Sequence, residues 1–349
     1  MAEKGRDPAA SPFHLAPRGL APGVSTMVGY RSAPAPAAVH RGLPSARLTF
    51  ILALDEGVEA GATEAEAASA RPNPLLLAGL HTVASHVRRE HAQAGIQLAV
   101  HPLAARALFG MPASALPLSG FDGAAVLGGW AAELQERLAE ESLTQEELVR
   151  EKREREGLGG PRGRSGTDGP REESTRKRTV REHPGQGIVP RERGADAERS
   201  RWTGLFGETA RALVRQHGRN DTVSSRLRPE LLQAWQLLER SGGAVSVSEL
   251  ASATGLSTRR LGTLFAQEVG HSPKQIAGLM RFERATRIIA RQVAGAGRAD
   301  LAGAATLAGY SDQAHLSREF ARYSGLPPRS WIAEEFRNIQ DGGHGAAAH

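Results

Sequence analysis

The sequence predicts an α+β chain of two domains, a β-rich N-terminal domain followed by an all-α C-terminal domain. Short aliphatic and β-branched runs separated by Gly, Pro and Asn lie in the N-terminal half, at Leu48–Leu54 and Gly95–Val100. A helix-turn-helix pattern occurs twice within residues 247–331. Between the two halves, residues 150–201 are highly charged and rich in glycine, with few aliphatic side chains to form a core.

The duplicated pattern is the most informative feature of the C-terminal half. Five positions recur after an interval of 55 residues, which places two similar units in tandem on one chain. The five pairs are Leu261 and Leu316, Phe265 and Phe320, Gly270 and Gly325, Pro273 and Pro328, and Lys274 and Arg329. We therefore expect a first helix-turn-helix over residues 247–269 and a second over residues 300–324.

The first copy contains start and stop signals for two helices. Ser246 and Glu249 have the capping-box spacing for the first helix, and Ser257 is a natural N-cap for the second. Gly255 ends the first helix, because glycine tolerates the positive φ that a tight turn requires. The second copy repeats this order with one extra turn residue, since Gly255 and Gly309 lie 54 positions apart.

A long linker helix is predicted between the copies, over residues 272–294. It begins at Ser272 and Pro273, with serine as the cap and proline in the first turn. Its apolar stripe continues for roughly 20 residues, which is about 30 Å of helix. One turn of B-DNA is about 34 Å, so the second helices of the two copies could enter successive major grooves on one face of a duplex.

This region resembles the DNA-binding domain of the AraC/XylS transcriptional regulators. The segment Gly309–Phe320, followed by Gly325 and Pro328, carries most of the resemblance, together with Leu250–Pro273. The resemblance covers residues 239–340. It implies a sequence-specific regulator of transcription in which the second helix of each copy reads bases.

Helix geometry assigns the reading positions. Leu261 and Phe265 face the core of the first unit, as Leu316 and Phe320 do in the second, which leaves the opposite helix faces open to DNA. The candidate DNA-binding residues are Thr258, Arg259, Arg260, Gly262, Thr263, Lys274, Gln313, Ala314, Ser317, Arg318 and Arg329.

These residues predict unequal readers. Arg259 and Arg318 fit bidentate contact with guanine, and Gln313 fits adenine. Gly262 removes a side chain from the first reading face and costs about 1 kcal/mol of helix propensity relative to alanine. We therefore expect Arg318 and Gln313 to carry most of the specificity, and the chain to recognise two dissimilar half-sites without a palindrome. Lys274 and Arg329 are expected to contact backbone phosphates.

The charge distribution agrees with DNA contact at the C-terminal end. Residues 202–349 contain 18 Lys and Arg against 13 Asp and Glu, whereas residues 1–149 contain 11 against 15. Surface arginines are usually solvated charges, and an isolated helix-turn-helix pattern is often a structural helix pair. Two copies with matched caps and a connecting helix favour DNA binding over that interpretation.

The N-terminal half resembles the cupin-like sensory domain that precedes AraC-type readers. The resemblance lies in Leu15–Arg31, His40–Pro44 and Leu103–Pro112. It implies a β-rich sensory domain that responds to a small molecule or a partner. Helices are predicted within it at residues 103–108 and 123–138.

Histidines in this half raise the question of a metal. His81, His86 and Glu90 are spaced by five and four residues, which does not place all three on one face of a strand. The spacing of a recognisable ligand set is missing. We therefore expect no metal and no cofactor.

The predicted organisation has six parts. They are a disordered tail at 1–11, the sensory domain at 12–148, a disordered Arg-, Gly- and Glu-rich linker at 149–201, packing helices at 202–238 that lead into the DNA-binding domain, that domain at 239–340, and a second disordered tail at 341–349. The chain has no cysteine, which excludes disulfides and thiol redox signals. Neither a membrane span nor the apolar core of a secretion signal is found, so we expect a cytoplasmic protein with no membrane partner.

Two other function classes stay open. One is a non-specific or architectural DNA-binding protein, and the other is a metal-dependent cupin-like enzyme fused to a DNA-binding domain. Walker loop, nucleophile elbow, dinucleotide fingerprint and zincin patterns are all missing from the sequence, so we expect no catalytic residues and no enzyme. The candidate partners are promoter or operator DNA, RNA polymerase, a small-molecule effector and a second copy of the chain.

Overall fold

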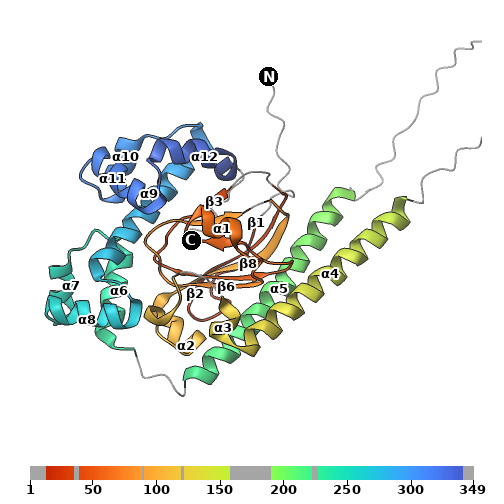
Figure 1. Cartoon of the computed structure of the whole chain (residues 1–349), viewed down its shortest axis with the longest axis horizontal. Helices are drawn as coiled ribbons and strands as arrows, with labels where there is room; N and C mark the ends of the chain where they lie inside the picture. Colours follow the sequence, from red (N-terminus) through yellow and green to blue (C-terminus); the bar gives the residue numbers. More distant parts are fainter. Residues whose placement is uncertain are drawn as a thin grey trace, which may run out of the picture.

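A computed structural model describes most of the 349-residue chain, namely residues 13–34, 39–88, 90–118, 122–157, 190–221 and 227–340. A β-rich N-terminal unit lies between a helical C-terminal unit and a pair of long helices (Figure 1). The predicted α+β class is confirmed. Both predicted tails, 1–11 and 341–349, lie outside the described residues. Within these residues, no helix is long and apolar enough to cross a membrane.

Two antiparallel sheets form the N-terminal unit. The larger has the strand order β1 (Phe13–Leu15), β2 (Val24–Ser32), β8 (Gln93–Val100), β4 (Leu48–Ala53) and β6 (Leu75–Ala78). The smaller has the order β3 (Val39–Gly42), β7 (Ser85–Arg88) and β5 (Ala60–Gly61). The strands predicted at 48–54 and 95–100 are β4 and β8.

Alternation along β4 gives the larger sheet two different faces. Phe50 is fully buried on the helix side, where its ring meets that of Phe109 edge to face at 5.7 Å. Thr49 and Ile51 point the other way, toward a cavity that the smaller sheet also lines. The helix-facing side is therefore core, and the opposite side is free to form a site.

Among the described residues, five helices and two short 3-10 turns belong to this unit. They are α1 (Glu64–Ser69), η2 (Pro102–Ala104), α2 (Ala105–Phe109), η3 (Ala113–Ala115), α3 (Gly123–Leu127), α4 (Gly129–Gly157) and α5 (Pro190–Asp221). The helix predicted at 103–108 is confirmed as η2 and α2. The single helix predicted at 123–138 is wrong, because Gly128 at φ 71° divides it into α3 and a much longer α4.

The predicted disordered linker is largely helical at both of its ends. Residues 149–157 complete α4 and residues 190–201 begin α5, and only residues 158–189 lie outside the described part of the chain. The two helices run side by side (Figure 1), joined by a 2.9 Å ion pair between Arg137 Nε and Glu208 Oε1. Charged residues such as Glu and Arg are good helix formers once a partner helix is present.

The packing helices predicted at 202–238 do not form one connection to the C-terminal unit. Trp202 of α5 is 2% exposed and stacks on His14 at 5.2 Å and on Phe206 at 5.8 Å. Its ring covers Gly29 of β2, where an added Cβ would lie only 2.1 Å from Trp202 Cε3. Helix α5 thus belongs to the N-terminal unit, and α6 (Pro229–Ser241) alone leads into the next.

The tandem units form as predicted. They consist of α7 (Val247–Thr254), α8 (Thr258–Val269), α9 (Pro273–Ala296), α10 (Leu301–Ala308), α11 (Gln313–Ser324) and α12 (Pro328–Gln340). Ser246 and Glu249 form the capping box, and Ser257 caps α8. The turns have left-handed Gly255 (φ 67°) and Gly309 (φ 85°), and the second turn is one residue longer, as expected.

Replacing Gly29 with alanine should loosen the contact between α5 and the larger sheet. The new methyl group would overlap the buried Trp202 ring, so we expect a loss of about 1–3 kcal/mol in the free energy of unfolding. Gly218→Ala in α5 is the control, because its Cβ would meet no atom within 4 Å. Chemical denaturation of both variants measures the difference, and equal stabilities would refute the packing argument.

Candidate nucleic-acid interface and interdomain cavity

Helix α9 holds the two helix-turn-helix units together. Its buried side includes Ile276, Leu279, Phe282, Ile289 and Val293, each at most 1% exposed. Ser272 and Gln275 form a capping box at its start. Both units pack on this one helix, which fixes their separation.

The first reading helix, α8, presents an open face. Leu261 and Phe265 are fully buried, and the Trp235 ring of α6 stacks on Phe265 at 6.3 Å. The opposite side leaves Thr258, Arg259, Arg260 and Thr263 exposed and Gly262 half-buried. A Cβ at Gly262 would meet nothing within 4 Å, so the reading face has no side chain at this position and no neighbouring atom covers it.

The second reading helix, α11, is anchored more strongly by aromatic rings. Phe320 is fully buried, with its ring 5.1 Å from Phe282 of α9 and 5.3 Å from Trp331 of α12. Asp312 caps the helix and accepts a hydrogen bond from the His315 backbone N–H, which lowers the pKa of its carboxyl. On the open side, Gln313, Ala314 and Arg318 are exposed and Ser317 is half-buried.

The two predicted phosphate contacts occupy equivalent places. Lys274 and Arg329 are exposed in the first turns of α9 and α12, each directly after a proline. Helix N-termini present free backbone N–H groups and a positive dipole end, both of which favour phosphate. The structure therefore leaves all eleven predicted DNA-binding residues at accessible or partly accessible positions, on α8, α11 and these two helix starts.

The N-terminal unit contacts the first helix-turn-helix at the C-terminal end of α8. Arg106 of α2 makes a bidentate ion pair with Glu268, at 2.7 Å from Nε and 3.1 Å from Nη2. Ser114 of η3 donates to the Gln267 carbonyl at 2.5 Å, and His271 Nε2 lies 2.5 Å from the Leu80 carbonyl oxygen. These contacts leave the reading face of α8 uncovered.

The N-terminal unit contacts the second helix-turn-helix through β3. Arg41 Nε donates to Glu334 of α12 at 2.9 Å, and His40 Nδ1 lies 3.1 Å from Oε1 of the buried Glu335. Next to β3, the hydroxyl of Ser45 donates to Glu283 of α9 at 2.5 Å. One strand and its following turn thus reach both α12 and α9.

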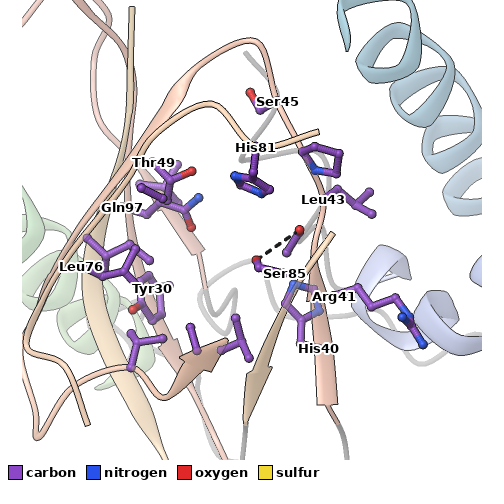
Figure 2. A pocket seen from close by; sticks show the side chains of 18 of the residues that line it. Tyr30, His40, Arg41, Leu43, Ser45, Thr49, Leu76, His81, Ser85 and Gln97 are labelled. Carbon is purple, nitrogen blue, oxygen red and sulfur yellow. Dashed lines mark hydrogen bonds between the residues drawn. The ribbon is translucent and has the colours of Figure 1, made fainter. Parts of the chain in front are cut away.

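A cavity of about 280 Å³ lies between the two sheets and α9. Its sheet side includes Tyr30, Thr49 and Gln97 (Figure 2). Phe282 and Glu283 of α9 line it as well. Figure 2 also shows Arg41 directed away from the cavity, in keeping with its ion pair to Glu334. The cavity is therefore bounded by both units of the chain.

Sequence reasoning did not identify this cavity. Thr49 is the one polar residue of β4, and Gln97 interrupts the apolar run that follows Gln93 in β8; those interruptions were the available signal. Which strands lie next to each other, and that α9 closes the space, depends on contacts between residues up to about 240 positions apart, as between Ser45 and Glu283.

The three residues weighed as metal ligands are separated in space. His81 lines the cavity, and burial lowers the pKa of its imidazole. His86 Nε2 lies 3.2 Å from Arg41 Nη1, and Glu90 pairs with Arg88 at 2.5 Å. In the described part of the chain, no group of three His, Cys, Asp or Glu residues is placed to hold a metal ion.

Two open recognition helices on a shared helix define a tandem helix-turn-helix DNA-binding domain. Residues 250–334 match a family model described as a helix-turn-helix domain. The match identifies the C-terminal unit as a helix-turn-helix DNA-binding domain of the AraC type. No curated protein sequence matches the chain.

Solved structures of ToxT from Vibrio cholerae match in outline. ToxT from Vibrio cholerae O395 is 9% identical, with 93% of this chain and 98% of that chain covered and a TM-score of 0.39. ToxT bound to (E)-4-(8-methylnaphthalen-1-yl)but-3-enoic acid is 7% identical, with 88% and 98% covered and a TM-score of 0.36. At such TM-scores this likeness adds nothing to the argument for function, which rests on residues 250–334.

Arg318→Ala should relax sequence preference at one base position. Loss of a bidentate guanine contact should weaken binding to duplexes with the preferred base by about 1–3 kcal/mol and change binding to the other duplexes little. Arg329→Ala is the matched variant, because loss of a phosphate contact weakens binding to all sequences alike and lowers the salt slope by about one. Titration of randomised duplexes at several salt concentrations separates the two effects. Unchanged preference in Arg318→Ala, with preference lost in Arg259→Ala, would reverse the expected ranking of the readers.

Proposed function

We propose that the protein is a transcriptional regulator that reads two dissimilar half-sites with α8 and α11, and that a small molecule bound in the interdomain cavity modulates it. The observation that carries the first part is that α8 and α11 both have an uncovered reading face and are held together by one helix, α9. This helix has 24 residues, or about 36 Å, close to the roughly 34 Å turn of B-DNA.

The composition of the two faces supports unequal half-sites. Helix α8 offers Arg259 beside the bare Gly262, whereas α11 offers Gln313 and Arg318 on one exposed face. Arginine and glutamine each discriminate bases through paired hydrogen bonds. We expect the half-site read by α11 to be the better defined of the two.

The position of the cavity supports modulation of the second reader. Phe282 lines the cavity, and its ring centroid lies 5.1 Å from that of Phe320 (edge to face) and 5.0 Å from that of Tyr323 (tilted), both on α11. On the opposite wall, β3 lines the cavity and pairs with α12 through Arg41. A molecule in the cavity would thus touch residues one contact away from both α11 and α12, whereas the anchors of α8 lie outside the cavity lining.

The remaining partners follow from this proposal. A regulator of this kind acts where promoter DNA is found, which places it in the cytoplasm, and RNA polymerase is its natural partner there. Because one chain carries both readers, recognition of a complete site does not require a second copy. We propose no catalytic role for the cavity.

Site selection with the full chain tests the regulator against an architectural DNA-binding protein. We expect one discrete, asymmetric site of about 15–20 base pairs to be enriched from random duplexes, because two fixed readers contact two separate grooves. Footprinting of the enriched sequence measures its length. Salt-dependent binding with no enriched sequence would favour the architectural protein instead.

Two matched variants test whether each reader is held separately. Arg41→Ala removes one ion pair to α12, and Arg106→Ala removes one ion pair to the end of α8. Loss of a tether that preorganises a reader should weaken its own half-site by about two- to fivefold. We therefore expect Arg41→Ala to weaken binding to duplexes in which only the α11 half-site is intact. Arg106→Ala should weaken binding to duplexes in which only the α8 half-site is intact. Equal effects on both sets, or a gain in affinity, would contradict separate preorganisation.

A further inference from the structure

Three hydrogen-bonding side chains form a diagonal row on the cavity side of the larger sheet. Gln97 lies on the central strand β8, and its neighbours across the sheet are Val28 and Ile51. Tyr30 of β2 pairs with Gly95, two residues before Gln97, and Thr49 of β4 pairs with Ala99, two residues after it. Since residues two apart share a face, the three side chains line up across three adjacent strands (Figure 2).

Gly95 makes room for this row. A Cβ at Gly95 would lie 2.7 Å from Tyr30 Oη and 2.9 Å from Tyr30 Cζ, so the phenol ring lies against bare backbone beside Gln97. Any side chain at this position would displace the ring, and the glycine thus serves the cavity wall.

The row has unused hydrogen-bonding capacity. Within the described residues, the phenol of Tyr30, the hydroxyl of Thr49 and the amide of Gln97 make no side-chain hydrogen bond, and all three line the cavity. Together they offer a phenolic and an alcoholic hydroxyl plus an amide with two donors and an acceptor. Burial raises the pKa of Tyr30, which keeps its phenol neutral and able to donate.

The charged side chains that line the cavity have both signs. Arg41 is paired with Glu334 at 2.9 Å. On α9, Glu283 and Arg287 lie four residues apart on the side that lines the cavity, so this wall carries one charge of each sign. The space beside the row is walled by aliphatic side chains, among them Val28, Ile51 and Leu76. The row itself has no charged side chain, so a charged ligand group bound to it would lose hydration without gaining a counter-charge from the row.

We propose that the cavity binds an uncharged ligand with an apolar body and a hydroxyl or amide group, held by Tyr30, Gln97 and Thr49. This inference rests on the proposed function, in which the cavity is the regulatory site, and adds the chemical class of the molecule. The neutral polar group lies on the sheet, and the apolar body extends between the aliphatic walls toward Phe282.

Calorimetric titration of the full chain with four indole probes tests this class. Indole-3-carboxamide and indole-3-methanol are neutral, indole-3-carboxylate is an anion and tryptamine is a cation, on one common skeleton. We expect the two neutral probes to bind at least about tenfold more tightly than the charged ones, since burying an uncompensated charge costs more than one lost hydrogen bond.

Variants assign the contacts. The near-isosteric Thr49→Val and the Gln97→Leu substitution should each weaken the binding of indole-3-carboxamide by about fivefold, which corresponds to one net hydrogen bond. Arg287→Leu, on the opposite wall, should leave its affinity unchanged. Tightest binding of indole-3-carboxylate with loss in Arg287→Leu would overturn the proposal in favour of an acidic ligand, and binding of none of the probes would also overturn it.

A DNA titration of the same preparations separates this inference from the proposed function. Intact sequence-specific DNA binding without preference for the neutral probes would contradict the ligand class alone. Preference for the neutral probes in a chain that binds DNA without sequence preference would contradict the proposed function and leave the ligand class supported.

Discussion

The buried side of α9 is the constraint on which the rest of the structure depends. Both helix-turn-helix units pack on it, and its Phe282 ring joins the aromatic cluster of α11. The same helix closes the cavity with Phe282 and Glu283. Because interiors are close-packed, a displacement at one side of such a helix is felt by the residues on the other. DNA reading and the cavity therefore share one structural element.

The N-terminal unit holds the two readers by different means. The first is fixed by the ion pair between Arg106 and Glu268, outside the cavity lining. The second is fixed through β3, where Arg41 belongs to the cavity wall and to the contact with α12. The asymmetry of the reading faces is thus matched by an asymmetry of attachment. Both follow from a duplicated scaffold whose copies have different neighbours.

Local signals in the sequence predicted the tandem units well, because caps and turns are encoded within a few residues. Ser257, Gly255 and the longer second turn all appear where the pattern places them. Parts of α4 and α5 were predicted, but their extension into residues 149–157 and 190–201 and their pairing were missed, since long-range contacts such as Trp202 on Gly29 are not revealed by a local pattern. The cavity was missed for the same reason: Thr49 and Gln97 become neighbours only through strand pairing.

Hydroxyl-radical footprinting of the full chain on its selected site tests most directly whether one α9 sets the spacing of two readers. The geometry predicts two protected patches on one face of the duplex, about one helical turn or 10–10.5 base pairs apart, with different sequences beneath them. A single patch, or two patches related by a palindrome, would contradict it, because the first leaves one reader unused and the second requires two chains.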